Sequence, residues 1–427
     1  LFDHYGVQRV DDMDQLATAL IMFAQPNATA AGGIACLHDS GGERQLLIDL
    51  ADQHSVPLAQ LGKQTLQTLQ GLLDPGLPAV NPLDGWGAGG ADAPANMATC
   101  FTRLLEDNDA ALGAVIHDRG PNGEVYQSYM AYLHQAQAAT NKPVFLVANR
   151  QGSGSDDLAI SSTHKGFPVI DGVSQFLVGA RCLLGYRDFH QRQTMELAAL
   201  DPEKVAHWRE HLCAQEQITE VVASQCLADF GIPMVLGVQV ENQAELIQAA
   251  GKLTYPLVVK TAQPDITHKS DQAGVRLNIQ SESSLIEAYQ DLRQRLGKAA
   301  MVAPMVESGG IEMILGIASD DQFGPVVVLG FGGIYAEVLA DTSVLLPPFD
   351  KATALRTIEQ LKMSPLLKGA RGLPKVDIDA YGEAAARLSV FAAEFGDLIR
   401  EVDINPIKIM PKGCIGMDAL MVPRGSG

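Results

Sequence analysis

Residues 257–275 read LVVKTAQPDITHKSDQAGV, and this stretch is the strongest signal in the chain. Its first residues are typical of a buried strand that ends on Lys260. A polar loop follows, in which His268, Lys269 and Ser270 are consecutive. A lysine on a rigid strand is a fixed positive charge for a phosphate, and loop amides with a serine hydroxyl can surround phosphoryl oxygens. The alternative, which these residues alone leave open, is a solvated basic turn.

Glycine-rich stretches downstream are the second signal. They are Gly309-Gly310-Ile311-Glu312 and Gly330-Phe331-Gly332-Gly333, with Asp321-Gln322-Phe323-Gly324-Pro325 between them. Glycine lets a backbone approach a ligand closely, and acidic groups nearby can hold a ribose hydroxyl or a cation. Hairpin turns use glycine as well, so this signal alone is weak evidence for a ligand site.

The third signal is Glu401-Val402-Asp403-Ile404-Asn405-Pro406, followed by Gly416-Met417-Asp418. In a strand, period-two alternation places Glu401, Asp403 and Asn405 on the same side. Oxygen ligands of this kind suit Mg²⁺, which usually keeps waters and contacts phosphates. The alternative is an edge strand with a polar face.

Outside these signals the N-terminal part alternates apolar strands with helical patterns. Strands are predicted at 33–38, 111–116 and 143–148. This rhythm predicts an α/β fold, with a parallel sheet, helices on both faces, and ligand loops at the carboxyl ends of the strands. In the C-terminal part, strands are predicted at 257–260, 300–303 and 326–329, with helices near 241–251, 283–296 and 380–395.

Composition limits the class of protein and of partner. The chain has 427 residues, 47% hydrophobic, and a formal net charge of −19, which argues against nucleic acid as a partner. No run of about 18 apolar residues predicts a membrane span. The six scattered cysteines are typical of buried thiols in a reducing cytoplasm. The chain opens on Leu1, which suggests part of a longer polypeptide, and residues 423–427 read as a tag remnant.

Taken together, the three signals resemble the ATP-grasp domain of NDP-forming (ADP-forming) acyl-CoA synthetases, the relatives of succinyl-CoA synthetase. The resemblance covers residues 220–422. Besides the loop through His268 and the Gly332-Gly333 pair, it includes Phe230-Gly231-Ile232-Pro233, Phe323-Gly324-Pro325, residues 366–372 (LLKGARG) and Asp403-Ile404-Asn405-Pro406. One departure is Ala273, where the family usually has a second glycine.

The resemblance implies roles for individual residues. It implies that Lys260 and His268 are catalytic, His268 as a second phosphate acceptor beside the nucleotide. It implies Asn405 and Asp418 as Mg²⁺ ligands. It implies an ATP site made of Lys260, Lys269, Ser270, Val302, Ala303, Met305, Val306, Glu312, Gly332 and Gly333.

Residues 1–190 resemble the flavodoxin-like domain of the same family, and 191–219 would be a linker. Ser40-Gly41-Gly42 opens a predicted helix whose free amides suit the docking of a phosphohistidine loop, with Asn81 and Asp84 holding a neighbouring loop. The alternative is a plain helix start. The sequence Asn81-Pro82-Leu83-Asp84-Gly85-Trp86-Gly87 is similar to that of members that act on aromatic or larger acids.

The resemblance implies an ATP-dependent acid–CoA ligase that passes through an acyl phosphate and a phosphohistidine. ATP and Mg²⁺ would bind to this chain, and CoA mainly to a CoA-binding domain outside it. In the family the principal phosphohistidine lies on a loop of a domain that would come before this chain, and His164, which superficially resembles it, stands in the wrong place. The family commonly pairs subunits, so a homo-oligomer is expected. Alternatives are a degenerate ligand-sensing module of a protein acetyltransferase, or an ATP-dependent lyase with a CoA thioester intermediate.

Overall fold

The computed structural model describes residues 1–85, 87, 91–118, 127–152, 157–192, 195–263, 266, 272–332, 340–372 and 374–425. The chain separates into two compact units, one of residues Phe2–Gln193 and one of Thr194–Gly427 together with Leu1. Within the described residues, no helix has the length and apolar character that crossing a membrane requires. All cysteines are free, and every one except Cys213 is buried.

The N-terminal unit is a parallel α/β sandwich. Its five-stranded sheet has the order β2-β1-β3-β4-β5. The strands are β1 (Gly33–His38), β2 (Leu83–Asp84), β3 (Ala110–His117), β4 (Val144–Ala148) and β5 (Val169–Asp171). β1, β3 and β4 are buried along their whole length, as expected for strands covered on both faces. The predicted flavodoxin-like parallel sheet is therefore confirmed.

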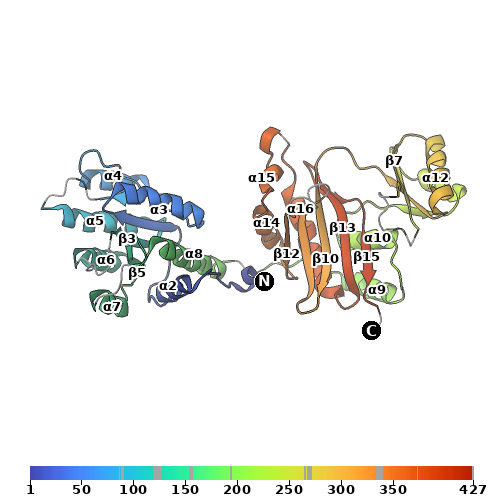
Figure 1. Ribbon diagram of the computed structural model, residues 1–427. Helices are drawn as coiled ribbons and strands as arrows, with labels where there is room; N and C mark the ends of the chain where they lie inside the picture. The colour runs from blue at the N-terminus through green and yellow to red at the C-terminus, as the bar shows by residue number, and fades with distance from the viewer. Residues whose placement is uncertain are drawn as a thin grey trace. The chain divides into compact units, whose positions relative to one another are not determined.

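Helices cover both faces of this sheet (Figure 1). One face packs against α2 (Met13–Phe23), α3 (Gly41–Gln53) and α8 (Val173–His190). The other packs against α4 (Lys63–Leu72), α5 (Ala93–Glu106), α6 (Gln127–Thr140) and α7 (Asp157–His164). The short helix α1 spans Phe2–Tyr5. Residues 191–219, the predicted linker, contain the helix α9 (Pro202–Cys213), which packs Trp208 and Leu212 into the core of the second unit.

The C-terminal unit contains two antiparallel sheets. The larger has the order β12-β11-β10-β13-β14, with β15 also paired to β13. Its strands are β10 (Ile311–Asp320), β11 (Gly324–Phe331), β12 (Thr342–Leu345), β13 (Ile399–Ile409), β14 (Cys414–Gly416) and β15 (Leu420–Pro423). Its core includes residues of α9, α10 (Glu220–Asp229), α14 (Lys351–Glu359), α15 (Ser364–Leu367) and α16 (Ile378–Phe395), and the 3₁₀ helix η1 spans Ala370–Gly372.

The smaller sheet has four strands in the order β6-β9-β7-β8. They are β6 (Val238–Val240), β7 (Leu257–Thr261), β8 (Val275–Ile279) and β9 (Ala300–Pro304), and they pack against α11 (Gln243–Ala250) and α12 (Glu282–Leu296). The two-lobed ATP-grasp architecture predicted for this part is confirmed.

Candidate functional site

Lys260 lies near the end of β7 and connects the smaller sheet to the larger one. Its Nζ donates to Oε1 of Glu220 at 2.9 Å and to the carbonyl of Met417 at 2.7 Å. Its Nζ is also 3.7 Å from Oδ2 of Asp418. The side chains of Lys260 and Glu220 are only 11% and 10% exposed, so this ion pair is largely removed from water.

The backbone around Lys260 is held from both sides. β7 lies between β9 and β8. Lys260 is opposite Met301 of β9 on one side and opposite Val275 of β8 on the other. One residue later, the amide of Thr261 donates to the carbonyl of Gly274 at 2.8 Å. The lysine therefore projects from an interior strand, which makes its charge a fixed one.

An acidic row on β13 faces the same region. Val402 and Ile404 are buried in the core, while Glu401 and Asp403 occupy the other face of the strand, as the period-two pattern predicts. Burial raises the pKa of Asp403, and the charges of Glu401 and Asp418 raise it further, while a hydrogen bond from the Asn405 side chain lowers it. These groups are thus close enough to interact.

The connection between β14 and β15 brings Asp418 to this row. The amide of Met417 donates to the carbonyl of Pro406 at 2.9 Å, which fixes residues 417 and 418 beside β13. The structure therefore brings Lys260 together with Asp418 and the region of Asn405, which lie much later in the sequence.

The oxygen donors of Asn405 and Asp418 fit a hard cation such as Mg²⁺. Among the described residues, no group of three or more His, Cys, Asp and Glu side chains forms a metal cage. Mg²⁺ is commonly held by one or two protein oxygens together with waters and phosphate oxygens. The Mg²⁺ role of these two residues stays a prediction.

The residues predicted to contact adenine lie on and after β9. Val302 and Ala303 are buried, and their strand is paired with β7, so their backbones are interior to the small sheet. Met305 and Val306 follow the strand and are partly buried, and the Met305 amide donates to Pro256 at 2.9 Å. Their contact with a nucleotide stays a prediction.

Glu312 and Gly332 are neighbours at the ends of β10 and β11. The Glu312 side chain is exposed, and its carbonyl accepts from the amide of Gly332 at 3.0 Å. A Cβ on Gly332 would lie 2.8 Å from the carbonyl carbon of Met313, so the backbones approach too closely for any other residue type. His268, Lys269, Ser270 and Gly333 lie outside the described residues.

The predicted docking site in the N-terminal unit lies at the carboxyl edge of its sheet. Ser40 is the N-cap of α3, and no capping hydrogen bond of its side chain is found in the described part of the unit. A Cβ on Gly41 would lie 3.1 Å from Oδ2 of Asp84, and one on Gly42 3.9 Å from the Ser40 hydroxyl, so these residues are close together. Their role in docking a phosphohistidine loop stays a prediction.

Asn81 has a structural role that the sequence only partly suggested. Its Oδ1 accepts from the amide of Cys36 at 3.0 Å, and its Nδ2 donates to the carbonyls of Ile34 at 2.8 Å and Ala59 at 3.0 Å. The side chain thus joins β1 to the segment between α3 and α4, and both of its amide hydrogens are used within the fold.

Glu220, the main partner of Lys260, was not predicted from the sequence. It is the first residue of α10 after the N-cap Thr219. An acidic residue in the first turn of a helix is ordinary, because it complements the helix dipole. No local signal therefore distinguishes Glu220 from other first-turn acids.

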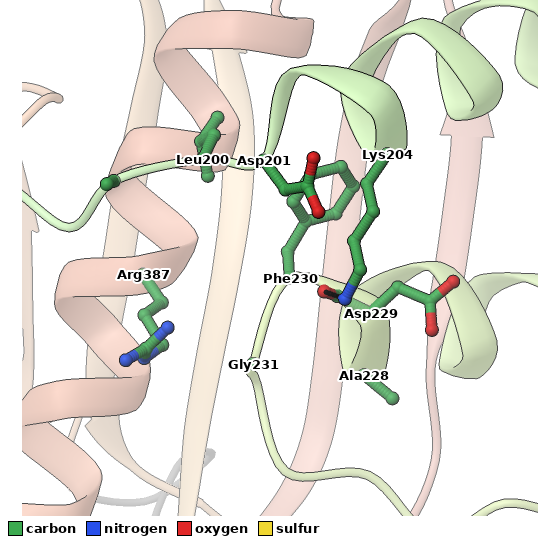
Figure 2. A pocket seen from close by; sticks show the side chains of 9 residues that line it. Leu200, Asp201, Lys204, Ala228, Asp229, Phe230, Gly231 and Arg387 are labelled. Atoms are coloured by element: carbon green, nitrogen blue, oxygen red, sulfur yellow. Dashed lines mark hydrogen bonds between the residues drawn. The ribbon is translucent and has the colours of Figure 1, made fainter.

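A pocket of about 310 Å³ lies elsewhere in the C-terminal unit, among α9, the turn after α10, and α16. Figure 2 shows Lys204 and Arg387 approaching it from different helices, with Gly231 on the connecting turn. Lys204 donates to the carbonyl of Asp229 at 2.9 Å, and Arg387 donates to Glu383 at 2.8 Å. None of the predicted site residues lines this pocket, so it is separate from the candidate site.

The second unit is similar in sequence to known ATP-grasp proteins. Residues 212–422 match the family described as ATP-grasp domain. Over 215 residues, the chain is 34% identical to the β subunit of acetate–CoA ligase (ADP-forming) I from Pyrococcus furiosus, covering 48% of this chain and 91% of that protein. Over 425 residues it is 27% identical to acetate–CoA ligase (ADP-forming) I from Archaeoglobus fulgidus, covering 97% of this chain and 59% of that protein.

A solved structure is also similar. The dinucleotide-forming acetyl-coenzyme A synthetase 1 of Ca. Korarchaeum cryptofilum, in complex with coenzyme A, Ca-AMPCP and HgCl+, gives a TM-score of 0.48 at 29% identity, covering 52% of this chain and all of that one. Among the curated relatives that match 97% or 98% of this chain, the chain spans 59% to 61% of their length. Because its ATP-grasp region is 34% identical to nearly the whole of a ligase subunit, the chain belongs to the family of ADP-forming acyl-CoA synthetases.

Proposed function

We propose that this chain is the ATP-using part of an ADP-forming acid–CoA ligase. The observation that supports it most is the convergence of Lys260, Glu220 and Asp418 at the junction of the two sheets, within a chain of this family. A cation fixed on an interior strand can offset negative charge on a phosphoryl group, and carboxylate and amide oxygens nearby can hold Mg²⁺.

The overall reaction would join a carboxylic acid and CoA at the expense of ATP, releasing ADP and phosphate. A histidine nitrogen would attack the γ-phosphorus of ATP and release ADP, and a carboxylate oxygen of the acid would then attack the phosphorus of the phosphohistidine, which frees the histidine and forms an acyl phosphate. The CoA thiolate would attack the acyl carbon and expel phosphate. Dividing the reaction in this way replaces one difficult step with easier ones. His268 would accept a phosphoryl group beside the nucleotide, and Ser40-Gly41-Gly42 with Asp84 would receive a phosphorylated loop.

Within this chain, Lys260 would orient the nucleotide phosphates. Asn405 and Asp418 would hold Mg²⁺, which supplies charge neutralisation to the transferring group when bound. CoA would bind mainly to domains other than the two described. Full-length relatives are longer than this chain, and we therefore expect it, tested by itself, to bind Mg-ATP without forming an acyl-CoA.

Incubation of the chain with γ-labelled Mg-ATP tests the proposal. We expect the protein to become labelled, and Lys260→Met to lower labelling at least tenfold, because phosphoryl charge is then uncompensated. Lys298→Met is the matched control, since Lys298 belongs to the same lobe but pairs with Glu241 on the surface. His268→Ala should abolish the label.

The outcomes separate the alternatives. A wild-type chain that binds Mg-ATP but never becomes labelled would favour a ligand-sensing module over a ligase. Labelling that survives His268→Ala would place the acceptor elsewhere. If Lys298→Met reduced labelling as much as Lys260→Met does, the proposed role of Lys260 in phosphoryl transfer would be contradicted.

A further inference from the structure

The pocket among α9, the turn after α10, and α16 has one rigid apolar wall. Its volume of about 310 Å³ is at the lower end of the range for sites that hold small molecules. Phe230, which lines it, is only 5% exposed, and its ring packs against Phe391 and Phe395 with centroids 5.3 Å apart in both cases. Leu200 and Ala228 extend the apolar lining. A ligand here would therefore meet an apolar surface that the core of the unit holds in place.

A glycine makes room for the arginine of this pocket. Gly231 has a φ of +79°, in the left-handed region that favours glycine. A Cβ there would lie 2.7 Å from Nη1 of Arg387 and 3.2 Å from its Cζ, so any side chain at this position would displace the guanidinium group. Gly231 belongs to the motif Phe230-Gly231-Ile232-Pro233, which has no part in the proposed reaction. The motif thus forms one side of the pocket and leaves space for a cation.

Both cations of the pocket have hydrogens to offer. Arg387 donates from Nε to Oε1 of Glu383 at 2.8 Å, and its Nη groups have no acceptor among the described residues. Lys204 gives one hydrogen to the carbonyl of Asp229 at 2.9 Å and forms no ion pair with a carboxylate in the part of the chain that the structure describes. These donors are available to a ligand at no cost in existing contacts.

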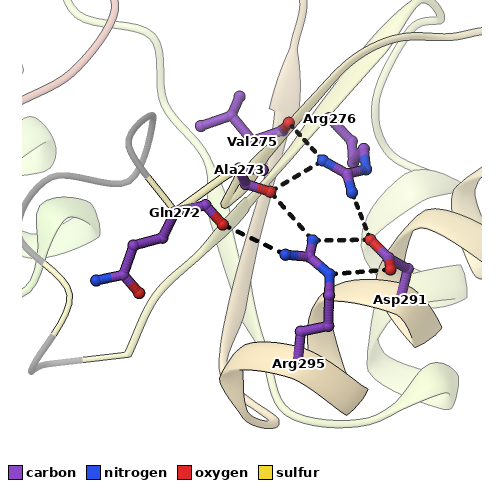
Figure 3. A network of polar contacts seen from close by, with 6 residues as sticks. All are labelled: Gln272, Ala273, Val275, Arg276, Asp291 and Arg295. Atoms are coloured by element: carbon purple, nitrogen blue, oxygen red, sulfur yellow. Dashed lines mark hydrogen bonds and ion pairs between the residues drawn. The ribbon is translucent and has the colours of Figure 1, made fainter.

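Other arginines of the same unit are saturated by the fold. Arg276 and Arg295 share the carboxylate of Asp291 and the carbonyl of Ala273, as Figure 3 shows. Arg295 alone donates to Asp291 from Nε at 3.0 Å and from Nη2 at 2.8 Å. Each of these two arginines is 36% exposed, the same fraction as Arg387. At equal exposure, Arg387 therefore differs in keeping its Nη groups for another acceptor.

The two acids that line the pocket are already used as acceptors. Oδ2 of Asp229 accepts from Nε1 of Trp208 and Oδ1 accepts from Gln225, both at 2.9 Å. Figure 2 shows the carboxylate of Asp229 directed away from the arginine of α16. Asp201 is the N-cap of α9, where its Oδ1 accepts from the amide of Glu203 at 2.9 Å. The side-chain groups that remain for a ligand are thus mostly donors.

We propose that the pocket between Lys204 and Arg387 binds a small organic oxyanion, a carboxylate or phosphate group on an apolar body, at a site separate from the nucleotide. The planar fork of an arginine matches either group, and the lysine adds a point charge. The apolar body would lie against Phe230 and Leu200. The proposal goes beyond the ligase reaction and does not rest on it.

Titration with benzoate and with phenyl phosphate in a Trp86→Phe background tests the proposal. Trp208 then reports on the pocket, because it binds Asp229, whose carbonyl accepts from Lys204. We expect its fluorescence to change with a Kd on the order of 1 mM or lower for at least one probe. Benzamide, which has the shape of benzoate without the charge, should bind about tenfold more weakly or worse. Inorganic phosphate should bind more weakly than phenyl phosphate, because it buries no apolar surface.

Variants locate the binding. Arg387→Ala and Lys204→Ala should each raise the Kd about tenfold or more, through the loss of a charge-assisted hydrogen bond. Arg387→Lys should fall between, since an ammonium group keeps the charge but not the fork. Arg295→Ala is the matched control: it removes an equally exposed arginine of the same unit whose hydrogens are already used, and it should bind the probes as the wild type does.

The outcomes are decisive in both directions. Binding of one probe and not the other would support the site and show which oxyanion it selects. Benzamide bound as tightly as benzoate would overturn the proposal, and so would an unchanged Kd in Arg387→Ala and Lys204→Ala. Weakening by Arg295→Ala of the same size would reveal a general effect of charge and overturn it as well. So would the absence of both a fluorescence change and a heat of binding up to about 10 mM probe. None of these results bears on labelling by Mg-ATP, so the ligase function would stand or fall separately.

Discussion

At the scale of single residues, the candidate site depends on one lysine whose charge is compensated before any ligand arrives. Glu220 is the nearest acid, and Asp418 and the carbonyl of Met417 complete the surroundings of Lys260. An ion pair this buried is costly to disrupt from one side, because the remaining charge is left without compensation. The sequence identified Lys260 as a cation at the end of a strand, but its partners come from distant parts of the chain.

His38 is a buried histidine outside the candidate site. It ends β1, is fully buried, and neither ring nitrogen has a hydrogen-bond partner among the described residues. Burial, with a contribution from the charge of Arg44, lowers the pKa of His38 to about 4. The unfolded chain therefore binds a proton here near pH 6.5 that the folded chain binds only near pH 4.

We expect His38 to make the N-terminal unit less stable in acid. The free energy of unfolding of this unit should decrease as the pH falls from 6.5 towards 4, by roughly 2 kcal/mol between pH 7 and pH 5. In that range the unfolded chain binds a proton at residue 38 that the folded chain does not bind. His38→Leu should remove this loss. Calorimetry at pH 7 and pH 5, which follows the transition of the N-terminal unit, measures it.

His164→Gln is the control for this prediction. His164 is exposed in the same unit, so folding does not desolvate it, and its replacement should leave the acid loss in place. An acid loss of the same size in His38→Leu and wild type would contradict the role of His38.

At the scale of elements, glycine-rich sequence turned out to serve two different purposes. Asp320 closes the turn between β10 and β11, where its Oδ1 accepts from the amides of Gln322 and Phe323, and Gly324 has a φ of +76°. Residues 320–324, which belong to the second sequence signal, therefore form a hairpin turn, the alternative that the glycines alone left open. Gly332 differs, because its neighbour is the backbone of β10.

Gly332→Ala is expected to lower the stability of the C-terminal unit by roughly 1 to 3 kcal/mol, because the added Cβ meets main-chain atoms that cannot move aside cheaply. The added Cβ would lie 2.8 Å from the carbonyl carbon of Met313 and 2.9 Å from its carbonyl oxygen. Urea unfolding followed by Trp208 fluorescence in a Trp86→Phe background checks it.

The same change at Gly251 is the comparison. A Cβ there would meet its nearest neighbours at 3.6 Å, and its φ of −63° suits alanine, so Gly251→Ala should cost little. Equal stability of the two variants would contradict the close approach of β11 to β10.

At the scale of the whole molecule, the two units should respond differently to nucleotide. Mg-ATP bound at Lys260 would stabilise the unit of residues 194–427 by about 2.7 kcal/mol at a concentration of one hundred times Kd. For a unit of this size that raises Tm by roughly 5 to 10 °C. Calorimetry should show one transition moving and the transition of the N-terminal unit unchanged.

Lys260→Met should remove most of that shift, whereas Lys298→Met should keep it. If both transitions moved together, nucleotide binding would not be confined to the C-terminal unit. If neither moved, the cluster around Lys260 would not be a nucleotide site.

Sequence by itself determined the fold of each unit and the types of residue in the site. Buried parallel strands such as β1 and β3 show as continuous apolar runs, and the alternation of Val402 and Ile404 with Glu401 and Asp403 shows directly which side of β13 is polar. These are local patterns, because side-chain direction repeats along a single element.

Only the tertiary structure decided which of these residues meet. Glu220, Lys260 and Asp418 come from a helix start, an interior strand and a loop between two strands, and Asp291 reaches the backbone at Ala273 through two arginines. Such contacts depend on how sheets and helices pack over long separations in the chain, and no spacing in the sequence records them.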